Sequence, residues 1–372
     1  MLMTRGAPAP APFDHPEADI VLRSSDKEPL DFRTFKLLLA LSSPFFSEIF
    51  TLPQPPTPSL NSVASPYADE YMSFDPVTLK HKRIPVIQMT EDKETLTLLL
   101  GLCLPTSIHP QPFISALDQL VKVAEAAFKF EMVEIQRHLR EVLTSQRFIE
   151  SQPTRVFAIA YRYSWDLEAR KAARYTLRHA LNVPYVDELQ YISAATFYKL
   201  QEYHRICGEV ASSRVMLQPA LAEHNDSWVW ITCKRCPGSF EATTMRWSTL
   251  LNFTNTQTHP DSRKWWVQWI EEVAKELRAR PWGETVRKWD AMSKAIEKAS
   301  PCTSCGPRVR QDLDTFAQML AVEIERDISS VCIHFLYRNS RRRLTVSLFR
   351  STWRSLSTNG VLRRLRLEGS VS

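Results

Sequence analysis

Two Cys-x-x-Cys pairs are the residues of this chain whose type and spacing most clearly indicate chemistry. The first pair is Cys233 and Cys236, followed by Pro-Gly, and the second is Cys302 and Cys305, followed by Gly. A two-residue gap lets both sulfurs of a tight turn reach one ion, and a trailing glycine relieves the backbone strain of that turn. Two such turns supply four thiolates, a set that suits tetrahedral Zn²⁺ at Zn–S distances of about 2.3 Å. The sequence therefore predicts one structural zinc ion, because four protein ligands leave no open position for a substrate.

Three alternatives to this four-thiolate site remain open from the sequence. Each pair could be a redox disulfide, although neither follows a strand at the start of a helix, where thioredoxin-like motifs lie. The thiols could also be buried and unpaired, or His204 or His224 could replace one sulfur as a ligand. We expect the zinc site, because a doubled Cys-x-x-Cys pattern in a chain without a secretory signal is typical of metal binding.

The segment between the two pairs is rich in tryptophan. Eight of the ten tryptophans fall between Trp228 and Trp289. The apolar spacing from Trp265 to Leu277 predicts a helix that ends before Pro281, and the spacing from Val286 to Met292 predicts the next. A shared ion requires these helices to form a module inserted between the two turns. Core packing is the expected role of the tryptophans, with an aromatic ligand-binding box as the alternative.

The N-terminal part of the chain mixes short strand and helix patterns. Ile20 to Leu22 favours a strand that ends in a polar turn. Lys36 to Leu41 is apolar on nearly every side, so we expect a buried helix there. Ser43 is a candidate cap for a new helix, with Pro44 in its first turn, where a missing N–H costs nothing. This mixture predicts an α+β fold.

The pattern continues further along the chain. Ile84 to Met89 reads as a strand, which Pro85 places at a sheet edge or a strand end. Thr90 or Asp92 then caps a helix over Lys93 to Cys103. The segment Thr51 to Pro66 contains five prolines, and we expect an insertion that is neither helix nor central strand.

Several motifs of this N-terminal part recur together in one known family. Asp19-Ile20 in the first strand precedes a helix with the pattern x-Lys-x-x-Leu-Ala at residues 35–40, and Ser-x-x-Phe-x-x-x-Phe follows at residues 43–50. The same family has two later segments that are similar to this chain at Leu99 to Thr106 and at Val121 to Ile135. The second of these family segments is a helix. Together these motifs resemble a BTB/POZ domain, and their residues are most similar to those of BTB proteins from mushroom-type fungi. The resemblance implies assembly through a dimer surface near the N-terminal strand and the helices from Lys36 to Phe50, with no chemistry of the domain's own.

The chain departs from that family's pattern in two places. Phe35 stands where many BTB domains have His, so any role of that His does not transfer. Cullin-binding members of the family carry a hydrophobic-x-Glu signature, and none follows the first helices of this chain. Its absence weakens the case for a role in a cullin-type ubiquitin ligase.

We expect five regions along the chain. They are a disordered tail (1–16), a BTB/POZ domain with the Pro-rich insertion 51–66 (17–147), a helical extension like those that often trail BTB domains (148–212), a Trp-rich helical module with both Cys-x-x-Cys turns (213–335) and a basic tail (336–372).

Charge and cysteine usage suggest a compartment. From Arg338 onward nine arginines and one acidic residue give a net charge of +8, so the rest of the chain carries −2 of the formal total of +6. No apolar run is long enough for a membrane span, and Met1 to Pro16 lacks the apolar region of a signal peptide. An odd count of seven cysteines argues for a reducing environment. We therefore expect a cytoplasmic or nuclear protein that does not contact membranes.

The function expected from these observations is non-enzymatic. The chain has only 8 glycines, no Gly-rich phosphate loop and no Gly-x-Ser-x-Gly or His-Glu-x-x-His motif, so no catalytic residue is assigned. We expect an interaction protein that forms a homodimer or larger homo-oligomer through its BTB/POZ domain and binds other proteins. Two alternatives are a substrate adaptor of a cullin-type ubiquitin ligase and a nucleic-acid-associated regulator that uses the four-cysteine site and the Arg-rich tail.

Overall fold

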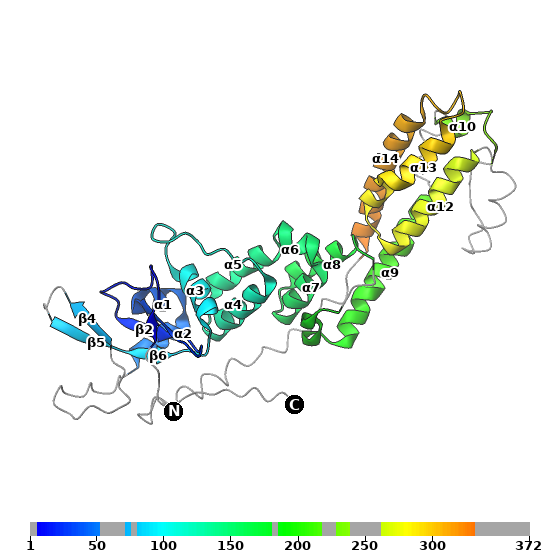
Figure 1. Cartoon of the computed structure of the whole chain (residues 1–372). Helices are drawn as coiled ribbons and strands as arrows, with labels where there is room; N and C mark the ends of the chain where they lie inside the picture. The colour runs from blue at the N-terminus through cyan, green and yellow to red at the C-terminus, as the bar shows by residue number, and fades with distance from the viewer. Residues whose placement is uncertain are drawn as a thin grey trace. The chain divides into compact units, whose positions relative to one another are not determined.

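The computed structural model describes residues 6–52, 71–75, 80–180, 185–217, 228–238 and 262–331. These residues form two compact units, the first ending at Ser145 and the second beginning at Gln146 (Figure 1). The first unit combines a small sheet with helices, and the second is mostly helical. The α+β class expected from the sequence is therefore what the described residues adopt.

The first unit is built around a four-stranded mixed sheet with the order β1-β3-β2-β6. Its strands are β1 (Ala7–Pro8), β2 (Ile20–Arg23), β3 (Leu30–Thr34) and β6 (Val86–Gln88). The β2–β3 pair is antiparallel, whereas β1 and β6 run parallel to their neighbours. A separate two-stranded sheet pairs β4 (Tyr71–Asp75) with β5 (Lys80–Ile84). Pro85 separates β5 from β6, which lies at a sheet edge as expected.

The centre of the sheet combines apolar burial with one buried ion pair. Ile20, Leu22 and Phe32 are fully buried. Arg23 and Asp31 lie opposite each other on β2 and β3, and the Arg23 Nε donates to the Asp31 carboxylate at 2.7 Å. Removing either partner would leave the other charge buried, so this pair favours the observed strand register.

The expected disorder of residues 1–16 is wrong for residues 6–16, and residues 1–5 lie outside the described part. The Ala7 N–H donates to the Pro29 carbonyl at 2.9 Å, which adds β1 to the sheet. Phe13 is 3% exposed, and its ring lies 5.4 Å from that of Phe32. The Ala/Pro-rich composition of this segment indicated disorder, but its Phe13 packs against Phe32 of the sheet and holds the segment in place.

Five helices complete the first unit. They are α1 (Lys36–Ser42), α2 (Pro44–Thr51), α3 (Lys93–Cys103), α4 (Leu117–Lys129) and α5 (Val133–Leu143). The predicted caps are confirmed: the Ser43 side chain accepts from the Phe46 N–H at 3.1 Å, and Asp92 accepts from the Thr95 N–H at 2.8 Å. Pro44 occupies the first turn of α2.

Three details of these helices differ from expectation. Helix α1 is half-exposed instead of buried, because only Leu39 among its leucines is fully covered. Helix α2 extends through Thr51, so the proposed insertion begins at least one residue later, and residues 53–66 lie outside the described part. The single helix suggested by Val121 to Ile135 is two helices, which meet at Glu131 with its left-handed φ of 54°.

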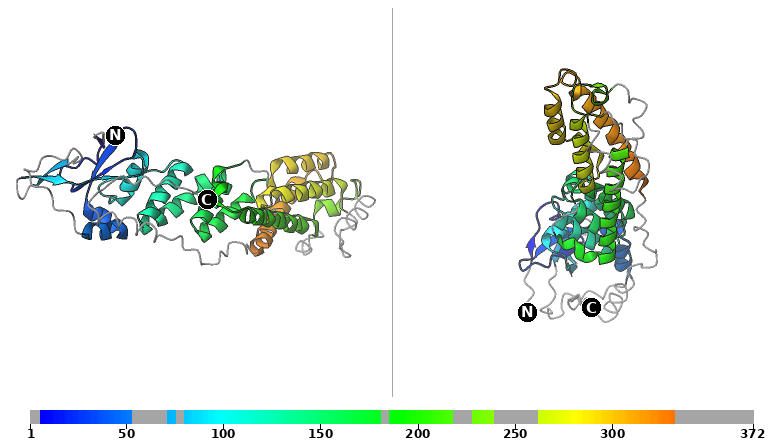
Figure 2. Two further views of the ribbon diagram at one scale, coloured as in Figure 1. Left: turned by 90° about the horizontal axis from the view of Figure 1, so that it is seen from below. Right: turned by 90° about the vertical axis from the view of Figure 1, so that its right-hand side faces the viewer.

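The second unit consists of helices. They are α6 (Gln146–Ser151), α7 (Pro153–Arg162), α8 (Asp166–Thr176), the 3-10 helix η1 (Asp187–Tyr191), α9 (Ala194–Leu217), α10 (Val229–Thr232), α12 (Lys264–Ala279), the 3-10 helix η3 (Gly283–Arg287), α13 (Trp289–Ala299) and α14 (Val309–Ser330). Helices α9, α12 and α14 pack side by side (Figures 1 and 2). Helix α9 runs without a break through the boundary expected at residue 212 and thus belongs to both expected regions.

Tryptophans form the core at one end of this unit. The Trp230 ring stacks on Trp228 at 5.0 Å and on Trp266 at 5.4 Å, and Phe316 meets it edge-on at 5.3 Å. These side chains are all buried, which confirms core packing as their role. Trp289, which the sequence placed in the same core, is instead 58% exposed.

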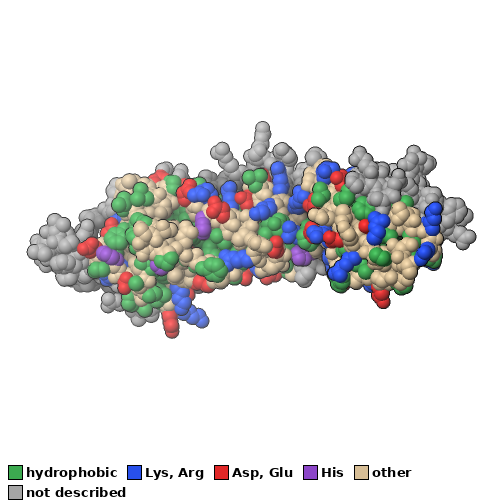
Figure 3. Space-filling view, turned by 90° about the horizontal axis from the view of Figure 1, so that it is seen from above, with side chains coloured by type: hydrophobic (Ala, Val, Ile, Leu, Met, Phe, Trp, Pro, Cys, Tyr) green, Lys and Arg blue, Asp and Glu red, His purple; other side chains and the backbone are tan. Residues whose placement is uncertain are grey.

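No described helix is both long and apolar enough to cross a membrane. On the face of the second unit seen in Figure 3, basic side chains lie with acidic ones between them. Several charged side chains of the second unit are paired within one helix, for example Arg205 with Glu202 and Glu209.

Candidate metal centre

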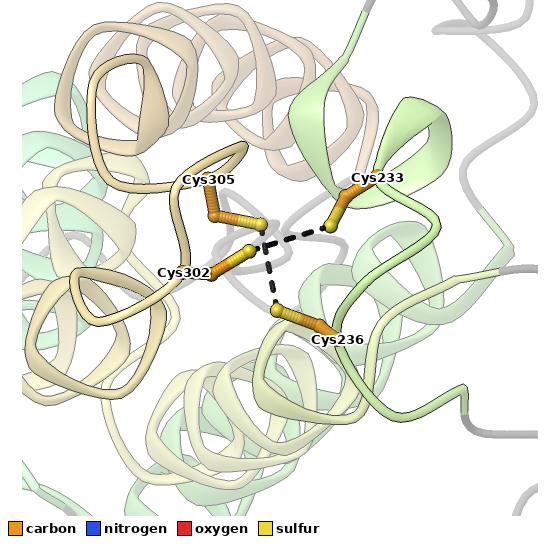
Figure 4. Close-up of side chains that lie close together, drawn as sticks. All are labelled: Cys233, Cys236, Cys302 and Cys305. Atoms are coloured by element: carbon orange, nitrogen blue, oxygen red, sulfur yellow. Dashed lines mark hydrogen bonds between the residues drawn. The ribbon is translucent and has the colours of Figure 1, made fainter.

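The four predicted cysteines meet at one point of the second unit (Figure 4). Cys233 and Cys236 follow the short helix α10, whereas Cys302 and Cys305 lie in the turn between α13 and α14. All four sulfurs lie within 4.8 Å of one another. The Cys233–Cys302 and Cys236–Cys305 sulfur distances are both 3.7 Å. The structure thus brings together the complete set that the sequence singled out.

These distances suit one tetrahedral ion. Four sulfurs at about 2.3 Å from a central ion would be separated from one another by about 3.8 Å. A disulfide needs about 2.05 Å, so the observed 3.7 Å separations are those of free thiols. A set of four sulfur ligands in this arrangement favours zinc or iron over magnesium or calcium, which prefer oxygen. The residues present therefore fit a tetrahedrally bound soft metal.

The backbone of each turn points N–H groups at the first cysteine of its pair. The Arg235 N–H donates to the Cys233 sulfur at 3.4 Å. Hydrogen bonds from the backbone of Cys305 and Ser304 lower the pKa of Cys302 to about 6. Burial opposes ionisation of Cys233, but backbone hydrogen bonds from Cys236 and Arg235 outweigh it and lower the pKa of that thiol. Both turns therefore favour a thiolate at their first position.

The second cysteine of each pair is in the opposite situation. Burial raises the pKa of Cys236 to about 11, and burial raises the pKa of Cys305 as well. A divalent cation reverses this preference, because a coordinating thiol gives up its proton. Metal binding at this site must therefore release protons, and its affinity must fall as the pH falls.

Helix α14 holds the first turn in place. The Asp312 carboxylate accepts from the Val229 N–H at 2.9 Å and so caps α10, which leads directly into Cys233. Arg308 pairs with the same carboxylate at 3.2 Å. Because Asp312 is almost fully buried, this contact fixes the start of α14 against the segment that carries the first pair.

Arg263 holds the other side of that turn. Its guanidinium donates to the Cys236 carbonyl at 3.0 Å, and its backbone forms a β-bridge with Gly238. The Arg235 guanidinium donates to the Thr303 hydroxyl and so connects the two turns directly. Sequence reasoning did not identify Arg263 or Asp312, since an Arg just before a helix and an Asp within one are ordinary surface patterns.

The two glycines that trail the cysteine pairs have different roles. A Cβ on Gly306 would lie 2.6 Å from the Ser300 carbonyl oxygen and 3.0 Å from that of Cys302, so only glycine fits. A Cβ on Gly238 would meet nothing closer than 4.0 Å. Neither glycine has the left-handed φ at which glycine relieves backbone strain, so that expectation is wrong for both, and Gly306 is required by close approach instead.

The structure also decides between the alternative ligands where it describes them. His204 is 2% exposed, and its Nε2 lies 3.0 Å from the His179 carbonyl, away from the sulfurs. His224 and Cys332 lie outside the described residues. Cys103 and Cys207 are free thiols that are not members of the cluster.

Comparison of the chain with protein-family models found no match, and comparison with curated proteins found none either. The BTB/POZ resemblance of the first unit therefore stays a prediction from the residues that carry it.

Proposed function

We propose that this protein is a non-enzymatic assembly protein that binds a second copy of itself through its first unit. In this proposal the second unit is held together by one structural zinc ion at the four-cysteine centre and presents helices to other proteins. The proposal joins the BTB/POZ resemblance to an exposed apolar surface on the first unit.

The order of elements supports the first half of the proposal. A hairpin of β2 and β3 is followed by the two short helices α1 and α2, the strand pair β4 and β5, a further strand β6 and the helices α3 to α5. The first strand, the two short helices and the later helices coincide with the segments that carry the resemblance. Ser43, from the quoted Ser-x-x-Phe motif, caps α2 and also donates to the Phe130 carbonyl, so the motif has a structural role in this unit.

The observation that carries the proposal is the pair Leu37 and Leu41 on α1. They are 67% and 76% exposed, and their i, i+4 spacing places them on one face of the helix. Full burial of one leucine side chain contributes about 1.5–3 kcal/mol, so a second copy that covers both gains several kcal/mol. The face lies within the segment Lys36 to Phe50, to which the resemblance assigns the dimer surface.

Two differently tagged copies of the chain, expressed together, test this proposal. We expect the native copies to co-purify and the double variant Leu37→Glu, Leu41→Glu to lose this association, because two carboxylates cannot be buried at an apolar contact. Leu167→Glu is the matched control, since Leu167 is 74% exposed on α8 of the second unit. Association that survives the double change in α1 but not the control would assign the interface to the second unit.

The donor set supports the zinc ion. Four cysteine sulfurs leave no coordination position for a substrate, and the close-packed tryptophans next to Cys233 are what a structural ion would stabilise.

A further inference from the structure

The sulfurs of the four-cysteine centre also form two facing pairs across the turns. Figure 4 shows Cys233 opposite Cys302 and Cys236 opposite Cys305, each pair joined by a dashed line at 3.7 Å. Each pair connects positions 69 residues apart in the chain. The two turns are therefore already arranged for covalent bonds from one to the other.

We propose that a peroxide converts the four-cysteine centre into two disulfides, Cys233–Cys302 and Cys236–Cys305, which then hold the two turns together in place of a metal ion. This inference concerns the same centre as the proposed zinc ion but needs only the four thiols. It makes the centre an oxidant-responsive site whose oxidised form keeps the turns connected.

Burial gives each cross pair one sulfur that a small oxidant reaches and one that it does not. Cys302 and Cys236 are half-buried, whereas their partners Cys233 and Cys305 are buried. The reachable sulfur attacks the peroxide: an S–O bond forms, the O–O bond breaks, and one water leaves. The buried sulfur then attacks the sulfenic acid, forming the S–S bond and releasing a second water.

The atoms and electrons of this conversion balance. Four thiols and two hydrogen peroxide molecules give two disulfides and four waters. With zinc present, four thiolates, two hydrogen peroxide molecules and four protons from solvent give the same products and one free Zn²⁺. To reach the S–S bonding distance, the sulfurs of each cross pair must approach by about 1.7 Å.

The other described cysteines are poor competitors. Cys103 and Cys207 lie outside the cluster, so neither faces a second described thiol with which it could close a disulfide.

Peptide mapping of the full chain tests the pairing. The native protein is treated with two equivalents of hydrogen peroxide, alkylated, digested without reduction and analysed by mass spectrometry, while a chelating dye records any zinc released. We expect four of the seven cysteines to become unavailable for alkylation, with both cross-turn peptides present. Pairing within a turn, bonds between chains, or four thiols that stay reduced would each overturn the proposal.

The variant Cys233→Ser sharpens the test. Cys302 then has no partner in its cross pair, so we expect the Cys236–Cys305 peptide alone, with a Cys302 sulfenic acid that a 1,3-dione traps. A Cys302–Cys305 disulfide in this variant would contradict the pairing, and Cys103→Ser should map as the native chain does. The map is decisive with or without bound metal, so a metal-free preparation would refute the zinc ion and leave this test intact.

Discussion

The sulfur of Cys233 lies 3.7 Å from the sulfur of Cys302, although 69 residues separate the two positions. Helices α12 and α13 lie in the chain between them, so the contact closes the Trp-rich part of the second unit into one module. Trp230, at the centre of its aromatic core, is only three positions before Cys233. Loss of the sulfur contact should therefore change the tryptophan fluorescence of this module.

Metal analysis of the purified chain should find about one zinc per chain, because a closed thiolate site binds tightly enough to survive purification. The variant Cys302→Ser should lose most of that zinc and shift tryptophan emission to longer wavelength, since binding energy at such a site is folding energy. Cys103→Ser, whose thiol is outside the cluster, should keep both properties. A metal-free native protein with the same tryptophan emission as the variant would remove the ion from this account.

Gly306→Ala should destabilise the second unit by about 1–3 kcal/mol, the usual cost of an overpacked site. The added Cβ would lie 2.6 Å from the Ser300 carbonyl oxygen and would push apart the turn that holds Cys302 and Cys305. Gly238→Ala provides the matched control, because no atom would lie closer than 4.0 Å to its added Cβ. Urea unfolding followed by tryptophan emission measures both, and equal stability of the two variants would contradict the tight turn at Gly306.

Asp92→Asn should lower the stability of the first unit at neutral pH but not near pH 2. Partial burial raises the pKa of Asp92, but hydrogen bonds from Lys122 and Thr95 outweigh it and lower the pKa to about 2. A depressed pKa gives stability that is present above the unfolded value of 3.8 and lost as the pH falls through about 2. Asn still caps α3, so the change isolates the charge.

The expected difference is roughly 1 kcal/mol, less than the full linkage value because the pair with Lys122 is partly exposed and screened. Urea unfolding of both proteins between pH 2 and pH 6 measures it. A difference that is constant over this range would show that the Asp92 charge contributes nothing.

Sequence patterns within a few residues correctly predicted the helices and turns whose form is set by residues adjacent in the chain. The helix Lys93–Cys103 has the expected bounds, because a capping Asp92 precedes a run of good helix formers. The four cysteines could be identified as one site because ligand spacing within each turn is itself local. The sequence did not indicate Arg263 or Asp312, whose roles depend on segments that fold together from distant positions.

Long-range packing explains the remaining errors. Leucines on every side of α1 indicated burial, but the sequence does not say which side the sheet covers, and Leu37 and Leu41 face away from the core. Docking of Phe13 on Phe32 depends on a sheet edge that an Ala/Pro-rich segment does not reveal. The break between α4 and α5 at Glu131 needs a positive φ, which no glycine signals at this position.

The mass of the full chain in solution tests the central claim most directly. One chain has a mass of 42.9 kDa, and light scattering at micromolar concentration should give about twice that value or a higher multiple. The double variant Leu37→Glu, Leu41→Glu should return to the mass of one chain. A native protein that stays a strict monomer across this concentration range would contradict assembly through the first unit.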